Sequence, residues 1–378
     1  SNFFDPYRKM PQTIPAAEQE ALRAEGRAAI RDAVVPAYAR LLAFFRSEYL
    51  PKARTTLAAE AMPDGQAWYR EQVRKYTTLD LSPDEIHVIG LREVAAIRAE
   101  MDAIIRQVGF QGSFAEFIAF LRTDPRFYAK TPQDLLDRAA WISKRVDGEI
   151  GKLIGTLPRG RFTIVPVPPD IAPFWTAGRG GADTYWLNTY DLPSRPLYNL
   201  PALTLHESAP GHALQGSLVR EQGEVPDFRK DYISAYGEGW GLYSEWLGKE
   251  MGIYETPYED FGRLTYAMWR ACRLVIDTGV HHKGWTRDRA LAYLRDNTAL
   301  SEHEVTTEVD RYISWPGQAL SYKLGELTIM RLRREAEAAL GPKFDVRAFH
   351  DAVLAQGSLP LPVLESQLQA WVVAQQAK

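Results

Sequence analysis

The sequence predicts a mainly α protein of the α+β class, a helical body with a small antiparallel sheet. Two observations support this class. Helix-start signals followed by apolar residues at helical spacing dominate most of the chain. Only the segment at about 157–200 is rich in proline and glycine and contains short β-type runs. Because no linker-like stretch divides the chain, we expect residues 1–378 to form a single domain.

Helices are expected over most of the first 155 residues. The segment "AAEQEALRAEGRAAIRDAVVPAYARLLAFFRSEYL" has helical character, and a kink is expected at Pro36, which lacks a backbone N–H. The run "SPDE" from Ser82 supplies an N-cap, a proline at the first helical position and a glutamate at the third, and its helix should end at Gly109. Similar signals start two more helices, at Ser113 with Glu116 and at Thr131 with Asp134.

The β-rich segment contains the runs "RFTIVPV" and "TYWLNTY", which predict strands. The stretch "GRGGAD" between them is expected to be a mobile loop, because glycine-rich loops flex. It lacks the spacing of a phosphate-binding loop. Helix signals resume near Pro201, immediately before the most distinctive motif of the chain, and continue with starts at Thr286 and at Ser301.

The composition excludes several classes of protein. With a net charge of -3, the chain has no basic field for nucleic acid, and we expect no nucleic-acid partner. No run of about 18 apolar residues suggests a membrane span, and no signal peptide is visible. The single cysteine, Cys272, cannot form an intrachain disulfide, and its setting "MWRACRLVI" predicts a core position.

The stretch "LTLHESAPGHALQG" resembles the zinc-binding helix motif H-E-x-x-H with two extra residues. His206 and His212 are six apart, so in a straight helix they would point about 120° away from each other. Pro210 removes a helical N–H, and Gly211 adopts dihedral angles that other residues avoid. Together they permit a local bulge that returns His212 to the face of His206. We therefore expect both imidazoles to bind one metal ion.

A third ligand is expected from "AYGEGWGLYSEWLGKEMG". A catalytic zinc site takes three protein ligands and keeps a fourth position open. Glu238 follows His212 by twenty-six residues, and Glu245 lies seven further on, on the same helical face. Glu238 is the predicted ligand, with Glu245 orienting a histidine. The expected cofactor is one Zn²⁺ ion.

Glu207 follows the first histidine directly and is the predicted general base toward a metal-activated water. This arrangement predicts a zinc-dependent hydrolase, most simply a metallopeptidase cleaving peptide bonds. The alternative is a non-catalytic helical binding protein with a structural or vestigial metal site. A structural zinc site usually has four ligands that include cysteines, and Cys272 lies away from this cluster in the sequence.

The strings "HESAPGHALQ", "YGEGWGLYSEWLG" and "WPGQALSYKLG" resemble the bacterial family catalogued as domain of unknown function 885, and the likeness extends over nearly the whole chain. Many members of that family carry a longer N-terminal region and are exported to the periplasm or secreted. The resemblance therefore implies a C-terminal portion or a short member. The compartment stays open.

The family is in turn remotely similar to the gluzincin zinc peptidases, which implies a gluzincin-like helical body. In thimet-oligopeptidase-like members a ligand glutamate follows the motif by about twenty-five residues, with another seven further on, and Glu238 and Glu245 match this spacing. In Taq-type carboxypeptidases a later string supplies tyrosines to the cleft. "GQALSYKLG" is similar to that string, with Tyr322 at a tyrosine position and Gln318 where the first tyrosine stands.

The remaining candidates concern the substrate, expected to be a peptide or another small amide. Tyr322 and His281 are candidate donors to the oxyanion formed during hydrolysis. The run "TYWLNTY", with Tyr185 and Asn188, is expected to bind an extended substrate along a sheet edge. Arg273, three residues after Arg270, could bind a substrate carboxylate or pair with acids such as Asp277. Neither the cleavage mode nor the oligomeric state follows from the sequence.

Overall fold

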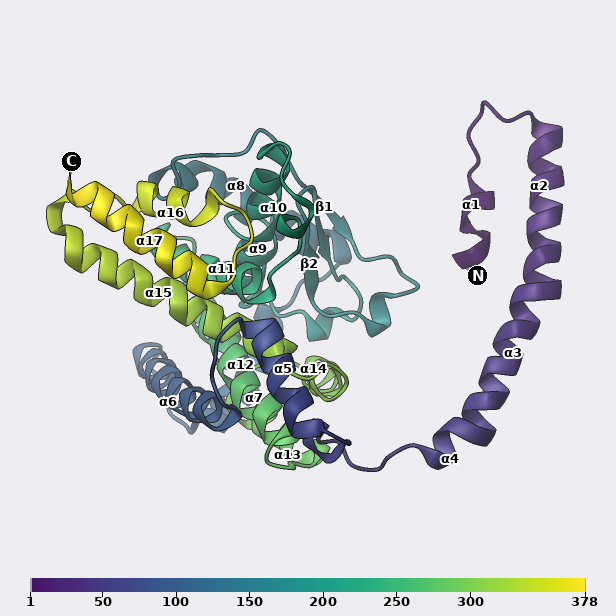
Figure 1. Cartoon of the computed structure of the whole chain (residues 1–378), viewed down its shortest axis with the longest axis horizontal. Helices are drawn as coiled ribbons and strands as arrows, with labels where there is room; N and C mark the ends of the chain where they lie inside the picture. The colour runs from purple at the N-terminus through teal and green to yellow at the C-terminus, as the bar shows by residue number, and fades with distance from the viewer. Residues whose placement is uncertain (1, 378) are drawn as a thin grey trace. The chain divides into compact units, whose positions relative to one another are not determined.

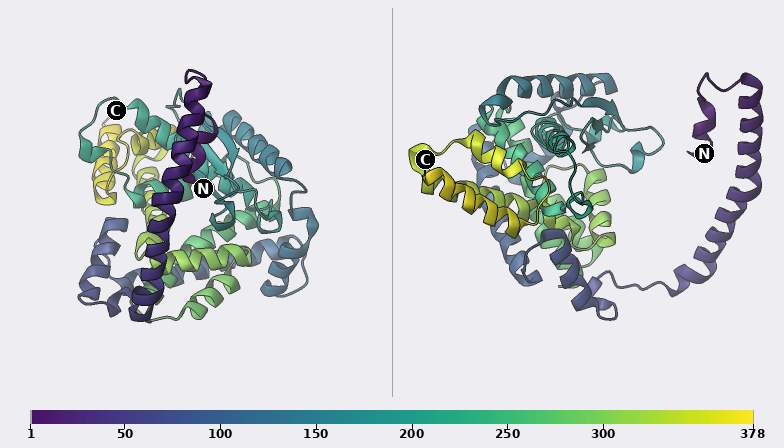
Figure 2. Two further views of the ribbon diagram at one scale, coloured as in Figure 1. Left: turned by 90° about the vertical axis from the view of Figure 1, so that its right-hand side faces the viewer. Right: turned by 45° about the horizontal axis from the view of Figure 1, so that its top comes forward.

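The computed structural model describes residues 2–377, which form two compact units that divide between Thr56 and Leu57. The first unit is a long helical rod, coloured purple in Figure 2. Its elements are two short N-terminal turns and a helix that runs from Ala16 to Lys52. In order they are η1 (Asn2–Phe4), α1 (Asp5–Arg8), α2 (Ala16–Ala29), η2 (Ile30–Val34), α3 (Val35–Phe44), η3 (Phe45–Tyr49) and α4 (Leu50–Lys52).

The predicted irregularity at Pro36 takes the form of a π-helical segment. The segment η2 ends just before the proline, and the N–H of Val35 donates to the carbonyl of Ile30, five residues earlier. The same pattern recurs before Pro51, where the N–H of Leu50 donates to the carbonyl of Phe45. A proline donates no backbone hydrogen bond, and π segments are one of the ways in which a helix accommodates that loss.

The second unit opens with helices whose starts the sequence predicts. Complete capping boxes at Ser82, Ser113 and Thr131 begin α6, α7 and α8, which confirms these three predictions. The elements are η4 (Ala59–Ala61), α5 (Gly65–Thr77), α6 (Pro83–Gln107), α7 (Phe114–Thr123), η5 (Pro125–Phe127), α8 (Pro132–Glu149) and η6 (Ile150–Lys152).

The small sheet is mixed rather than antiparallel throughout. Its strands β1 (Thr163–Pro166), β2 (Gly178–Gly180) and β3 (Thr184–Leu187) lie in the order β1-β3-β2. β2 and β3 are joined by a tight connection and pair antiparallel. β1 and β3 are parallel, because the longer connection between them lets both strands start at the same end of the sheet. Gly178 and Gly180 of "GRGGAD" thus lie in β2, and the expectation of a mobile loop there is wrong.

The remaining helices form the body around the motif. α12 packs along α6 and against α9, and α11 lies between α9 and α15. At the C-terminus α15, α16 and α17 lie together (Figure 1, green to yellow). No helix of residues 2–377 is long and apolar enough to cross a membrane. The elements are η7 (Ala172–Phe174), η8 (Leu192–Ser194), α9 (Leu200–Glu207), α10 (His212–Glu221), η9 (Asp227–Arg229), α11 (Ser234–Glu250), α12 (Pro257–His281), α13 (Arg287–Asn297), α14 (Glu302–Ser314), η10 (Gln318–Leu320), α15 (Ser321–Leu340), η11 (Gly341–Lys343), α16 (Val346–Leu354) and α17 (Leu361–Gln376).

The structure is therefore mainly helical with a small sheet, as the sequence predicts. α12 is its central helix, since nearly every side chain from Glu259 to His281 is buried. Cys272 is fully buried there, in the predicted core position. The site helices α9 and α11 lie against this core, which holds their side chains in place.

Candidate metal centre

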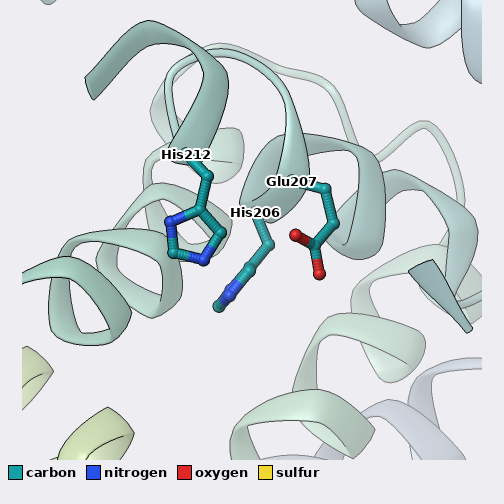
Figure 3. A group of neighbouring side chains, drawn as sticks. All are labelled: His206, Glu207 and His212. Atoms are coloured by element: carbon teal, nitrogen blue, oxygen red, sulfur yellow. The ribbon is translucent and has the colours of Figure 1, made fainter. Parts of the chain in front are cut away.

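The motif folds as two helices rather than as one bulged helix. α9 ends at Glu207 and α10 begins at His212. Between them the N–H of Gly211 donates to the carbonyl of Leu205 at 3.0 Å, and the Ala209–Pro210 peptide bond is cis. A Cβ on Gly211 would lie 1.9 Å from the carbonyl oxygen of His206, so only glycine fits there. Figure 3 shows how this loop brings the two imidazoles side by side.

The two imidazoles and Glu238 have the spacing of a metal site. The ring centres of His206 and His212 are 4.8 Å apart. Glu238 Oε2 lies 3.5 Å from Nε2 of His206 and 3.3 Å from Nε2 of His212. With tetrahedral angles and bonds of about 2.0–2.1 Å, neighbouring zinc ligands are about 3.3 Å apart. Both separations from Glu238 therefore suit ligands of one zinc ion.

Glu207 belongs to the same cluster, because ligand atoms of His206, Glu207 and His212 all lie within 4.8 Å of one another. Two carboxylates thus adjoin the imidazoles. We assign the ligand position to Glu238, since one of its oxygens faces both Nε2 atoms at ligand spacing. Glu207 Oε2 instead accepts a hydrogen bond of 2.5 Å from the N–H of Gly180 in β2, which leaves Glu207 beside the candidate metal position.

Glu245 fixes the orientation of His206. Its side chain is 1% exposed, and Oε1 lies 2.8 Å from His206 Nδ1 and 3.0 Å from Nη2 of Arg270. A carboxylate only accepts hydrogen bonds, so Nδ1 of His206 carries a proton. The lone pair of the neutral ring is then on Nε2, which faces the metal position. The sequence predicts that Glu245 orients a histidine, and His206 is the histidine that it contacts.

The electrostatics of the cluster favour a cation. Burial opposes the charge on His206, but hydrogen bonds to Glu238 and Glu245 outweigh it and raise the pKa of His206 to about 9. Burial also opposes the charge on Glu238, yet the adjacent His212 and His206 hold the pKa of Glu238 well below its usual value. Without a metal, the carboxylates thus retain a proton on the imidazole of His206. A site that stabilises positive charge in this way suits a divalent ion.

Tyr322 lies against the cluster. Its ring is nearly parallel to that of His206, with centres 6.3 Å apart and an interplanar angle of 22°. The residue is 7% exposed. The structure therefore brings this predicted oxyanion donor next to a predicted metal ligand.

Tyr232 adjoins the site, and sequence reasoning missed it. The residue is 56% exposed, but its phenol is turned inward, since a Cβ on Gly237 would lie 2.3 Å from the hydroxyl. Burial of the hydroxyl, followed by the charges of Glu238 and Tyr322, raises the pKa of Tyr232 well above its ordinary value. No motif includes Tyr232, so only the folded chain reveals its position.

His281 does not fit the role of oxyanion donor. The ring is completely buried. Its Nδ1 accepts a hydrogen bond from the N–H of Ala59 at 3.2 Å, and its Nε2 lies 2.8 Å from the carbonyl oxygen of Tyr312, to which it donates. Because both ring nitrogens have backbone partners, His281 has no N–H left for a substrate.

Tyr185 and Asn188 are also held away from a substrate. Both are completely buried. β3, which carries Tyr185, is the central strand, so neither of its edges is open to an added peptide. The amide of Asn188 donates to the carbonyls of Ala172, Trp175 and Thr176 at 2.9–3.1 Å and braces that loop. The edge strand next to Glu207 is β2.

Of the two roles expected for Arg273, the structure shows pairing with an acid rather than a free guanidinium group for a substrate. The acid is Glu308 and not Asp277. Nη2 of Arg273 donates to Glu308 at 2.8 Å and its Nε to the hydroxyl of Tyr312 at 2.9 Å. Asp277 instead accepts from the hydroxyl of Tyr69 at 2.6 Å. Gln318 is buried in η10, immediately before α15.

The fold and the site together define a mainly helical protein with a candidate metal centre of two histidines and a glutamate. The chain belongs to the family described as bacterial protein of unknown function (DUF885), whose model matches residues 1–368. A search of the curated proteins finds no match.

Two solved structures of proteins described as putative lipoproteins are similar to this chain. The protein from Colwellia psychrerythraea is 34% identical, with a TM-score of 0.93 over 98% of this chain and 66% of its own. The protein from Shewanella oneidensis is 18% identical, with a TM-score of 0.68 over 98% of this chain and 70% of its own, and shares the fold. The chain thus spans about two thirds of the length of each of these relatives.

Proposed function

We propose that this protein is a zinc-dependent hydrolase, a metallopeptidase that cleaves peptides. The observation that carries the proposal is the placement of Glu238 Oε2 at 3.3 and 3.5 Å from the Nε2 atoms of His212 and His206. These are the separations of ligands around one tetrahedral ion. His206, His212 and Glu238 would hold the zinc, and Glu245 keeps His206 in the tautomer that can bind it.

A bound zinc ion supplies Lewis acidity, which polarises a carbonyl group and lowers the pKa of water. Glu207 accepts the proton of the attacking water and then delivers it to the leaving amine. The hydrogen bond from the N–H of Gly180 holds one carboxylate oxygen of Glu207 in place during both steps. The phenol groups of Tyr322 and Tyr232 are available as donors to the developing oxyanion.

An extended substrate would pair with β2 rather than with β3. β2 is an edge strand, and it contacts Glu207 through Gly180. Backbone pairing along the part of this edge that Glu207 does not occupy would position a peptide independently of its side chains. This supports peptides as the substrate class, although other small amides would use the same residues.

The competing function is that of a non-catalytic protein with a structural or vestigial metal. Cys272 is buried in α12 and supplies no ligand to the cluster. A structural site would also have no use for Glu207, which is 9% exposed and hydrogen-bonded to Gly180 beside the imidazoles.

The test compares wild type with Glu207→Gln, with Glu71→Gln on the exposed face of α5 as the matched control. Zinc content by mass spectrometry should be about one ion per chain in all three. Cleavage of a mixed peptide library should occur with wild type and Glu71→Gln and fall by at least about a hundredfold in Glu207→Gln. If zinc-loaded wild type cleaves no peptide, the binding function is favoured.

A further inference from the structure

Three guanidinium groups surround Tyr322. The centre of its ring lies 4.1 Å from Cζ of Arg273, 5.9 Å from that of Arg270 and 6.0 Å from that of Arg311. Since the same ring stacks on His206, this cationic cluster adjoins the candidate metal centre.

Two of the three arginines are buried and paired. The side chain of Arg270 is 3% exposed and lies 3.0 Å from Glu245. The side chain of Arg273 is 2% exposed and lies 2.8 Å from Glu308. Neither has a surface that a substrate could reach.

Arg311 differs from both. Its side chain is 28% exposed, and its Nη2 donates at 3.1 Å to Glu308, the carboxylate that also pairs with Arg273. Because Glu308 carries one negative charge and pairs with two guanidinium groups, one positive charge is left uncompensated. Arg311 is the more exposed of the two arginines, so this charge is accessible at Arg311. In addition, the buried Nε of Arg311 has no hydrogen-bond partner among residues 2–377.

The reach of Arg311 limits what it could bind. The centre of the Tyr322 ring lies 6.3 Å from that of the His206 ring and 6.0 Å from Cζ of Arg311, so the His206 ring and the guanidinium carbon are at most about 12 Å apart. An extended residue spans about 3.5 Å. With an ion at His206 and a hydrogen bond at Arg311, the interval accommodates one or two residues beyond the scissile bond.

We propose that Arg311 binds the free C-terminal carboxylate of the substrate, so that the enzyme removes one or two residues from the C-terminus of a peptide. This inference rests on the proposed hydrolase function. A guanidinium group binds a carboxylate through two parallel hydrogen bonds, which fixes direction as well as position. The surplus charge therefore selects peptides by their free end.

The first test measures binding without turnover. A short peptide as free acid and as C-terminal amide is titrated into the metal-free protein, because zinc itself would attract a carboxylate. The acid should bind at least about tenfold more tightly. Arg311→Gln should abolish this difference and Arg311→Lys should keep part of it. The control Arg287→Gln removes a similarly salt-bridged, exposed arginine and should leave the difference unchanged. Equal affinities in wild type, or a difference that survives in Arg311→Gln, would overturn the inference.

The second test identifies the products of the zinc-loaded enzyme by mass spectrometry. The free acid should release single residues or dipeptides from its C-terminus, and the amide should be cleaved at least about tenfold more slowly. Internal cleavage of both peptides at similar rates would overturn the inference while supporting the hydrolase. Tighter binding of the acid without any cleavage would overturn the hydrolase and still support Arg311 as a carboxylate site.

Discussion

His206 shows how much depends on single atoms at the residue scale. Its Nε2 faces Glu238, its Nδ1 contacts Glu245, and its ring stacks on Tyr322. The spacing of acids and histidines in the sequence is sufficient to select His206, Glu238 and Glu245, whereas Tyr322 follows only from the resemblance of "GQALSYKLG" to the carboxypeptidase string. The sequence is not sufficient for His281, whose backbone partners belong to distant segments, nor for Tyr232, which belongs to no motif.

Glu245→Gln should weaken zinc binding by about ten- to a hundredfold, as losses of such orienting partners typically do. The substitution removes the negative charge that holds His206 and leaves Arg270 without its carboxylate. Competition with a chromophoric chelator measures the affinity. Glu335→Gln, an exposed salt-bridged glutamate, serves as the control and should bind zinc like wild type. An unchanged affinity in Glu245→Gln would show that Glu245 does not orient the ligand.

His350 should make stability pH-dependent. It is completely buried, its Nδ1 lies 2.7 Å from the carbonyl oxygen of Leu153, and its Nε2 accepts from the hydroxyl of Tyr243 at 2.8 Å. Burial lowers the pKa of His350 from 6.5 to about 4. Between these values the unfolded chain binds more protons than the folded one, so the free energy of unfolding falls as the pH falls from 6.5 to 4.

Between pH 6.5 and pH 4 the free energy of unfolding should fall by about 3 kcal/mol because of His350. Urea unfolding of wild type and His350→Gln at several pH values measures it. The variant should be less stable at pH 7 but should lack this part of the pH dependence. Parallel pH profiles for the two proteins would contradict the assigned pKa.

At the scale of elements, local signals predict helix starts well and long-range pairing poorly. The capping boxes of α6, α7 and α8 lie within a few residues of sequence, so they could be identified directly. The parallel pairing of β1 with β3 depends on the path of the chain between them, which no local pattern records. The glycines of β2 likewise predict a loop, because glycine is disfavoured in strands.

Gly241→Ala tests the packing of α11 against α9. A Cβ at this position would lie 2.7 Å from Cε1 of His206 and would displace the ring. We expect zinc affinity to fall at least about tenfold. Gly148→Ala in α8 is the matched control, since a Cβ there meets nothing within 4 Å, and it should raise stability by up to about 1 kcal/mol. Chelator competition measures the zinc affinity of both variants, and urea unfolding measures their stability. An unchanged zinc affinity in Gly241→Ala would contradict the close contact between Gly241 and His206.

At the scale of the whole molecule, the two units differ in how they are stabilised. Among the described residues, the buried hydrophobic core lies within the second unit, whereas the first unit exposes large apolar side chains such as Tyr38, Leu41 and Phe44. Sequence periodicity predicted helix in both units. It did not distinguish a helix with a buried face from one without, because that depends on what packs against it.

A chain of residues 57–378 should therefore fold on its own. It keeps the core, the sheet and the site residues. Its melting temperature should lie within a few degrees of that of the full chain, and it should bind zinc with the same affinity. Calorimetry and chelator competition test this, and loss of the cooperative transition would show that the first unit is needed for folding.

The most direct test of the metal centre is anomalous scattering at the zinc edge from crystals of the zinc-loaded protein. One peak is expected, about 2.0–2.1 Å from Nε2 of His206, Nε2 of His212 and a carboxylate oxygen of Glu238, with Glu207 beside it. A peak at another site, or none at this one, would contradict the assigned metal centre.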